Sequence, residues 1–258
     1  MKVLITGGAG LVGSAIARKL SRAFEVLTPG HKLLDITSRA SVVSYMSRFK
    51  PEVVIHTAAC TNVSAAEAER GNKKGIAWIT NVEGTRNIDK VAKRSGAFHI
   101  FISTGSVFSG SSNNPGPFTE GNAPAGDSSK LTWYGWTKRM AERHVDGAII
   151  RISHPDYIHK LATIWQHNPR HAFYTDQLFP LTSFEDLARA CRKLIEKRAG
   201  GVYHVASPDL VSPYELFCYY LIRMGLSTNN INTQKCPKNT RYHAISSQRT
   251  ENLLGLRF

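Results

Sequence analysis

The chain has 258 residues, of which 42% are hydrophobic and 20% charged, and it carries a net charge of +14 at pH 7. This composition is that of an ordinary globular protein and excludes a disordered chain. The charge raises nucleic acid as a partner. Because the basic excess is spread along both halves of the chain, a phosphorylated small molecule explains it about as well.

Other classes of protein are excluded by simple patterns. No run of 18 apolar residues is present, so we expect no membrane-spanning helix and no membrane partner. The first residues lack the longer apolar region and cleavage site of a secretory signal. The four cysteines form no CxxC pair, so we expect reduced thiols and no metal site. We therefore expect a cytoplasmic protein.

Strand-like and helix-like segments alternate through the first half of the chain. Short apolar runs predict strands, and apolar residues at helical spacing predict helices. The expected strands are 2–6, 24–28, 53–56, 99–103 and 148–152, and the expected helices are 11–20, 38–49, 76–94 and 131–145. Strands joined by helices of this length imply right-handed crossovers. The predicted fold is therefore α/β, a Rossmann-type doubly wound parallel sheet.

Beyond residue 152 the alternation weakens. Helices are expected at 185–197 and 213–223, with a strand at 201–205 between them. We therefore expect a Rossmann domain that binds NAD(P) at residues 1–152. Residues 153–258 then form a smaller substrate-binding lobe, some elements of which return to the sheet. A stretch rich in Ser, Gly, Asn and Pro at 109–129 predicts a long surface loop.

A glycine-rich turn follows the first expected strand and opens the first expected helix. It reads TGGAGLVG over residues 6–13, in the context that a dinucleotide-binding turn requires. Gly7 permits the tight turn, Gly10 lets the backbone approach a pyrophosphate, and Gly13 lets helix and strand pack closely. The start of the helix then offers free N–H groups to the phosphates. The alternative is a glycine-rich turn without a ligand.

The region after the second expected strand bears on which cofactor is bound. NAD is usually held by an acidic residue there, through the ribose 2′-hydroxyl. Residues 26–32 contain no acid, and they end in His31 and Lys32, which suit a 2′-phosphate. We therefore expect NADP, with NAD as the second choice. The alternative is that both residues are solvated parts of a turn.

A tyrosine and a lysine stand four residues apart in the helix expected at 131–145. Tyr134 and Lys138 then lie on one helical face. A nearby ammonium lowers the pKa of a phenol and makes it a usable proton donor. A strand end rich in Ser and Thr, at residues 103–106, precedes them. A hydroxyl there can stabilise charge on a carbonyl oxygen, although capping is the simpler role for any one of them.

With these signals in this order, the sequence resembles the extended short-chain dehydrogenase/reductase family. Within it, the resemblance is closest to the dTDP-4-dehydrorhamnose reductase branch. It covers residues 1–152 and also rests on segments at 34–37, 51–67 and 81–85. The resemblance implies an oxidoreductase that transfers hydride from NADPH or NADH to the 4-keto group of a nucleotide-linked deoxysugar.

The resemblance also implies roles for individual residues. Tyr134 would be the general acid, Lys138 would hold the nicotinamide ribose, and Thr104 would be the active-site hydroxyl. Together with the glycine turn and the two basic residues after it, the expected cofactor contacts are Gly7, Gly10, Leu11, Val12, Gly13, His31, Lys32, Asp35, Ile36, Ala58, Ala59, Cys60, Tyr134 and Lys138. The expected substrate contacts are Thr61, Val63, Thr104 and Gly105, with Asn81 on the long helix beside the site.

Three departures from the branch concern the substrate half. Gly105 stands where an acidic residue often follows the active-site hydroxyl. Residues 152–157 replace a Trp and an aromatic-Gly pair that help to form the sugar pocket. The sequence ends at Phe258, where family members usually continue into a further helix. We therefore expect an intact cofactor half and an altered substrate pocket.

Several alternatives stay open at this point. A nucleotide-sugar epimerase or an epimerase-reductase uses the same tyrosine, lysine and hydroxyl. A non-catalytic NADP-binding regulatory subunit is a further alternative, favoured by the altered pocket. The expected partner is a nucleotide-sugar substrate, and nucleic acid is not expected. The oligomeric state is open, with a homodimer among the alternatives.

Overall fold

The computed structural model describes residues 1–237 and 240–258. Its strands are β1 (Lys2–Thr6), β2 (Glu25–Leu27), β3 (Val53–His56), β4 (Phe98–Thr104), β5 (Ala148–Ile152), β6 (Phe173–Tyr174), β7 (Gly201–Val205) and β8 (Thr233–Gln234). Its α-helices are α1 (Leu11–Leu20), α2 (Arg39–Phe49), α3 (Val63–Ala68), α4 (Ile76–Trp78), α5 (Thr85–Ser95), α6 (Trp133–Glu142), α7 (Tyr157–His167), α8 (Phe184–Lys197), α9 (Pro213–Arg223) and α10 (Gln248–Leu254). A π-helical segment, η1 (Ile79–Gly84), joins α4 to α5, and η2 (Gly105–Val107) and η3 (Ser128–Lys130) are short 3₁₀ turns.

The central sheet has six parallel strands in the order β2-β1-β3-β4-β5-β7. This confirms the expected α/β class with a doubly wound parallel sheet. β2 lies on one side of β1, and β3 and the strands that follow it lie on the other side. Such a switch point opens a crevice at the carboxyl ends of the strands, where ligands of this class of fold bind. β7 pairs with β5, so part of the second half of the chain returns to the sheet.

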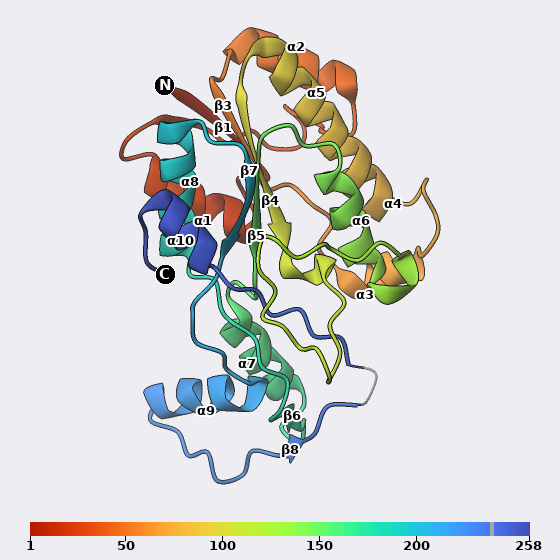
Figure 1. Ribbon diagram of the computed structural model, residues 1–258, viewed down its shortest axis with the longest axis vertical. Coiled ribbons are helices and arrows are strands. Elements are labelled where there is room, and N and C mark those ends of the chain that lie inside the picture. The colour runs from red at the N-terminus through yellow and green to blue at the C-terminus, as the bar shows by residue number, and fades with distance from the viewer. Residues whose placement is uncertain (238–239) are drawn as a thin grey trace.

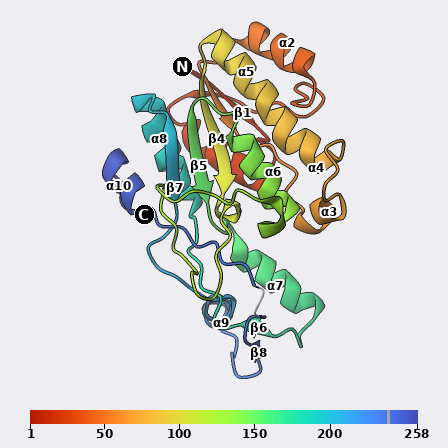
Figure 2. The ribbon, with the colours of Figure 1, turned by 45° about the vertical axis from the view of Figure 1, so that its right-hand side comes forward.

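Helices cover both faces of this sheet, α1 and α8 on one side and α2, α5 and α6 on the other (Figures 1 and 2). Side chains of a strand alternate between the faces. In β1, Val3 and Ile5 pack with Ile16 of α1, whereas Leu4 packs with the helices of the opposite face. Strands buried on both faces are apolar almost throughout, which explains why short apolar runs predicted them.

Helix starts follow local capping chemistry. Ser212 caps α9, and its side chain and that of Glu215 bond each other's backbone N–H, with Pro213 in the first turn. This capping box fixes the start of α9 where the sequence predicts it. The start of α1 is different, because Gly10 provides no side-chain cap. The first N–H groups of α1 are therefore open to a ligand.

Part of the second half of the chain lies beyond the carboxyl edge of the sheet. This part consists of α7, α9, β6 and β8 (Figure 1). The sequence did not predict α3, α7, α10 or the two-stranded β6–β8 sheet. The expected helix at 76–94 is helical throughout, but it contains the π-helical segment η1. Among the described residues, no helix has both the length and the apolar character needed to cross a membrane. The division of the chain at residue 152 stays a prediction.

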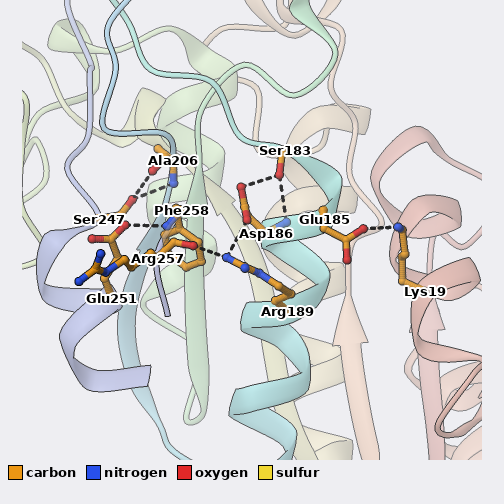
Figure 3. Close-up of polar contacts among 10 residues, drawn as sticks. All are labelled: Lys19, Ser183, Glu185, Asp186, Arg189, Ala206, Ser247, Glu251, Arg257 and Phe258. Carbon is orange, nitrogen blue, oxygen red and sulfur yellow. Dashed lines mark hydrogen bonds and ion pairs between the residues drawn. The ribbon is translucent and has the colours of Figure 1, made fainter. Parts of the chain in front are cut away.

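The last residues of the chain pack against α8 and β7 (Figure 3). Arg189 of α8 donates to the carbonyl oxygen of Arg257, and the N–H of Phe258 donates to Glu251 at 2.8 Å. Ser247, just before α10, exchanges hydrogen bonds of 2.8 Å with the backbone of Ala206 after β7. α10 is thereby held beside α8 on one face of the sheet.

Candidate active site

A groove of about 590 Å³ lies at the switch point between β1 and β3. Its walls come from the turns that follow β1, β2 and β3, together with α4 and the start of η1. These walls meet at the carboxyl edge of the sheet, where the topology places a ligand crevice.

The glycine turn forms one wall of this groove, and a side chain would clash at several of its positions. Gly7 has a φ of +69°, and a Cβ there would come within 2.8 Å of the backbone of Ala58. A Cβ on Gly13 would lie 2.3 Å from the carbonyl oxygen of Gly7. The uncapped start of α1 lies beside this turn and offers free N–H groups to an anion. The wall therefore fits the pyrophosphate of a dinucleotide.

Most of the expected cofactor contacts line the groove. These are Gly7, Gly10, Val12, Gly13, His31, Ile36, Ala58, Ala59 and Cys60, and Thr61 from the expected substrate contacts lies there too. The lining residues that sequence reasoning did not name as contacts are Thr6, Gly8, Ala9, Pro29, Gly30, Leu34, Thr37, Thr57, Ile76 and Thr80. Each of these except Ile76 and Thr80 lies within four residues of an expected contact, so a wider window around each strand end would have found them.

Eight expected contacts do not line the groove. Tyr134, Lys138, Thr104 and Gly105 lie at the neighbouring catalytic residues described below, and the other four are Leu11, Lys32, Asp35 and Val63. Leu11 and Val63 are exposed, at 52% and 43%, and Lys32 is exposed as well. The carboxylate of Asp35 instead accepts hydrogen bonds from the N–H and hydroxyl of Thr37, at 2.9 and 2.7 Å, and these bonds lower its pKa. The Asp-x-Thr spacing is the signal for such a local turn, and the contact of Asp35 with a cofactor stays a prediction.

The position of His31 in the groove gives a direct test of cofactor preference. We expect His31→Ala to weaken NADPH binding by about tenfold, the worth of one hydrogen bond to a charged group, and to leave NADH binding nearly unchanged. Lys32→Ala should change the ratio of the two affinities less, because Lys32 lies outside the groove. Fluorescence titration with both cofactors measures the ratio. An equal loss for NADPH and NADH would remove His31 from a 2′-phosphate site.

Two elements bring the expected catalytic residues together. Tyr134 and Lys138 lie on α6, whose start Thr132 caps at 3.1 Å from the N–H of Gly135, and Thr104 ends β4. A Cβ on Gly135 would lie 2.4 Å from the carbonyl oxygen of Ser106. Gly135 thus lets the start of α6 approach the end of β4, and the Thr104 hydroxyl comes close enough to the Tyr134 phenol to lower its pKa.

The pKa values of Tyr134 and Lys138 differ from the expectation. Burial raises the pKa of Tyr134 to about 12, and the nearby Thr104 hydroxyl only partly offsets this rise. The Nζ of Lys138 donates to the carbonyl oxygen of Ile102 at 2.7 Å and lies 4.0 Å from the centre of the Phe101 ring. Burial lowers the pKa of Lys138 to about 7. The expected lowering of the phenol pKa by Lys138 is therefore not found, because the amine is held by a main-chain carbonyl.

Residues from the second half of the chain pack beside Thr104 and Gly105, two of the expected substrate contacts. The Oγ1 of Thr104 also accepts from the N–H of Ser106 at 3.1 Å, so the capping role exists beside the expected one. A Cβ on Gly105 would come within 2.7 Å of the carbonyl oxygen of His243, which explains why no acidic side chain stands there. His154, in the divergent segment after β5, lies 5.2 Å from His243 between ring centres.

Asn81 joins the cofactor groove to α6. It is 1% exposed and lies in η1, and a π-helical turn inside a helix often marks a functional site. Its side chain accepts from the N–H of Cys60 at 2.7 Å and donates to the carbonyl of Cys60 at 3.1 Å and to Thr137 at 2.9 Å. The sequence placed Asn81 beside the site, and the structure agrees.

Comparison with known proteins decides the family. A family model described as RmlD substrate binding domain matches residues 1–254. The chain belongs to the RmlD family. Among its relatives, the spore coat polysaccharide biosynthesis protein SpsK of Bacillus subtilis is 28% identical, over 88% of this chain and 81% of that protein. Methionine adenosyltransferase 2 subunit beta of Xenopus laevis is 29% identical, over 89% of this chain and 74% of that protein.

A solved structure of a related enzyme has the same fold. The crystal structure of dTDP-4-dehydrorhamnose reductase from Bacillus anthracis in complex with NADP matches this chain with a TM-score of 0.85 and 26% identity, over 99% of this chain and 92% of that one. This confirms the expected family and fold. It also agrees with the expected class, NAD(P)-dependent oxidoreductases of the extended short-chain dehydrogenase/reductase type.

Proposed function

We propose that this chain is an NADP(H)-preferring reductase that acts on the 4-keto group of a nucleotide-linked deoxysugar. One observation carries the proposal. The glycine-walled groove leads along Cys60, which packs with Tyr134, to the place where Tyr134 and Thr104 meet at the start of α6 and the end of β4. The names of an RmlD-family relative in polysaccharide biosynthesis and of a reductase solved with NADP support the substrate class and the cofactor.

The residues suggest how a ketone is handled. When bound, the reduced nicotinamide supplies a hydride. Thr104 can donate its hydroxyl to the carbonyl oxygen and stabilise the charge that develops there. Tyr134 keeps its proton at neutral pH, because its pKa is about 12, and it can protonate the oxygen as the carbon is reduced. Lys138, with a pKa of about 7, gains a proton readily once a phenolate or a ribose hydroxyl lies beside it.

The proposal is tested by following NADPH consumption with dTDP-4-keto-6-deoxyglucose. The assay is run with and without an added 3,5-epimerase, beside a titration of NADPH binding. We expect turnover, and its dependence on the epimerase identifies the stereoisomer that the pocket accepts. Tight NADPH binding without turnover of this substrate or of other nucleotide-linked keto sugars would contradict the proposal.

A second candidate function is that of an NADP-binding regulatory subunit. The observation that favours it is the packing on the substrate side, where the carbonyl oxygen of His243 lies against Gly105 and the His154 ring stacks on Phe179 at 4.2 Å. A relative named methionine adenosyltransferase 2 subunit beta gives this candidate a partner class. It predicts tight NADPH binding, no turnover of keto sugars and a change in the activity of an added methionine adenosyltransferase.

A further inference from the structure

A row of buried polar residues joins the cofactor groove to the helix that carries Tyr134. Its members come from β1, β3, η1, α5 and α6, and each is at most 2% exposed: Thr6, His56, Asn81, Thr85 and Thr137. Polar groups so deeply buried need hydrogen-bond partners, and a fully satisfied network holds its members in one arrangement. The bonds of this row therefore hold the elements on which its members lie in one arrangement.

His56 stands at the centre of this row, between two threonines. Its Nδ1 lies 2.6 Å from the hydroxyl of Thr6, the last residue of β1, and its Nε2 lies 3.0 Å from the hydroxyl of Thr85, the first residue of α5. Thr85 donates its only hydroxyl proton to the carbonyl oxygen of Asn81, at 2.7 Å. Thr85 must then accept from His56, so the proton of the neutral imidazole sits on Nε2 and Nδ1 accepts from Thr6.

The bonds continue from Asn81 to the active site. The Asn81 amide uses both of its N–H groups and its oxygen, on Cys60 in the groove wall and on Thr137 in α6. Thr137 in turn donates to the carbonyl oxygen of Tyr134 at 2.8 Å. One directed chain of bonds thus runs from the end of β1, through the π-helical turn, to the backbone of Tyr134.

We propose that His56 is a positioning residue, which through Thr85 fixes the π-helical turn so that Asn81 can clamp Cys60 and α6 in register. Only the expected effect on turnover rests on the proposed function. The clamp itself is a property of the fold. Neither His56 nor Thr85 lines the cofactor groove, so loss of the chain should affect the site only through the residues it positions.

The sharpest variant is Thr85→Val, which keeps the shape of the side chain and removes its hydroxyl. Thr85→Ser keeps the hydroxyl and is the matched rescue. Thr85→Ser also removes a buried methyl group, and Ile88→Val in the same helix is the control for that loss. Ile88 is 1% exposed and packs away from the chain of bonds. All are made with Cys218→Ser and Cys236→Ser, since Cys191 is buried and Cys60 then remains as the accessible thiol.

The first readout is the rate at which iodoacetamide alkylates Cys60, which needs no turnover. We expect Thr85→Val to raise this rate by about fivefold, because Asn81 loses its bond from Thr85, holds the backbone of Cys60 less firmly and lets it open more often. We also expect kcat to fall by about tenfold, with the Kd of NADPH little changed, because the phenol is misplaced rather than removed. Thr85→Ser and Ile88→Val should both resemble the parent protein. Unchanged alkylation in a folded Thr85→Val protein, with a lowered Tm alone, would overturn the proposal.

The second readout uses the unmodified protein and covers the case in which Thr85→Val does not fold. Nitrogen-15 NMR of histidine side chains, with His56 assigned through its main chain, reports which ring nitrogen carries the proton. We expect the Nε2–H form between pH 6 and pH 8. The Nδ1–H form, or a charged ring, would contradict the direction of the bonds. Both readouts stand even if no keto sugar is reduced, so failure of this proposal and failure of the proposed function are distinguishable.

Discussion

Replacing Tyr134 by phenylalanine is expected to lower kcat by about 10²- to 10⁴-fold, the usual worth of a positioned general acid. The phenol is the group that meets Thr104, and its pKa of about 12 keeps it protonated and able to donate. The ring itself packs beside Cys60 and Trp133, and phenylalanine preserves that packing. We therefore expect the Kd of NADPH to change by less than about threefold, a loss of well under 1 kcal/mol.

Stopped-flow or steady-state NADPH oxidation gives kcat, and fluorescence titration gives the Kd. Tyr45→Phe is the matched control, because Tyr45 is 7% exposed and lies on α2, away from the groove. It should leave both constants unchanged. Equal loss of turnover and of cofactor affinity in Tyr134→Phe would mean that Tyr134 is structural. Retained turnover would mean that another group supplies the proton.

The second large effect is expected from Gly13→Ala. The new Cβ would lie 2.3 Å from the carbonyl oxygen of Gly7 and 2.7 Å from the hydroxyl of Thr57, so α1 must move away from the turn. The N–H groups at the start of α1 then lose their place beside the pyrophosphate. We expect the affinity for NADPH to fall by at least about 100-fold, close to 3 kcal/mol.

Overpacking of this kind also destabilises a folded protein, by about 1–3 kcal/mol. The control is Gly30→Ala in the same groove, where a Cβ would meet nothing within 4 Å. We expect Gly30→Ala to bind NADPH as the parent does. Circular dichroism shows whether Gly13→Ala is folded before its Kd is measured. A folded Gly13→Ala protein with unchanged affinity would show that the phosphates do not lie on this turn.

The sequence predicted those parts of the fold whose signals are local. The strands of the sheet are apolar on both faces, so their runs are plain, and Ser212, Pro213 and Glu215 mark the start of α9. The lobe offers fewer such signals. α7 begins after Asp156 with a φ of +58° and no side-chain cap, and its start depends on packing against the rest of the lobe. Elements of this kind are decided by tertiary context.

The candidate site also has features that local patterns predict and features that depend on distant residues. The glycine turn and the Tyr134 and Lys138 pair are local patterns, and the structure brings each to the carboxyl edge of the sheet. The packing of His243 against Gly105 joins residues far apart in the sequence, and no spacing rule predicts it. The partners of Lys138 were also missed, because they depend on how deeply α6 is buried against β4.

If this member of the RmlD family reduces a nucleotide-linked keto sugar at C4, as proposed, the hydride of NADPH must appear on that carbon. The most direct measurement uses NADPH carrying deuterium at C4 of the nicotinamide, in each stereochemical form, with dTDP-4-keto-6-deoxyglucose and an added 3,5-epimerase. Proton NMR of the product then locates the label. We predict one deuterium at C4 of the sugar from one of the two forms, with one NADPH consumed per sugar. A product that forms without label and without net consumption of NADPH would contradict the claim and identify an epimerase instead.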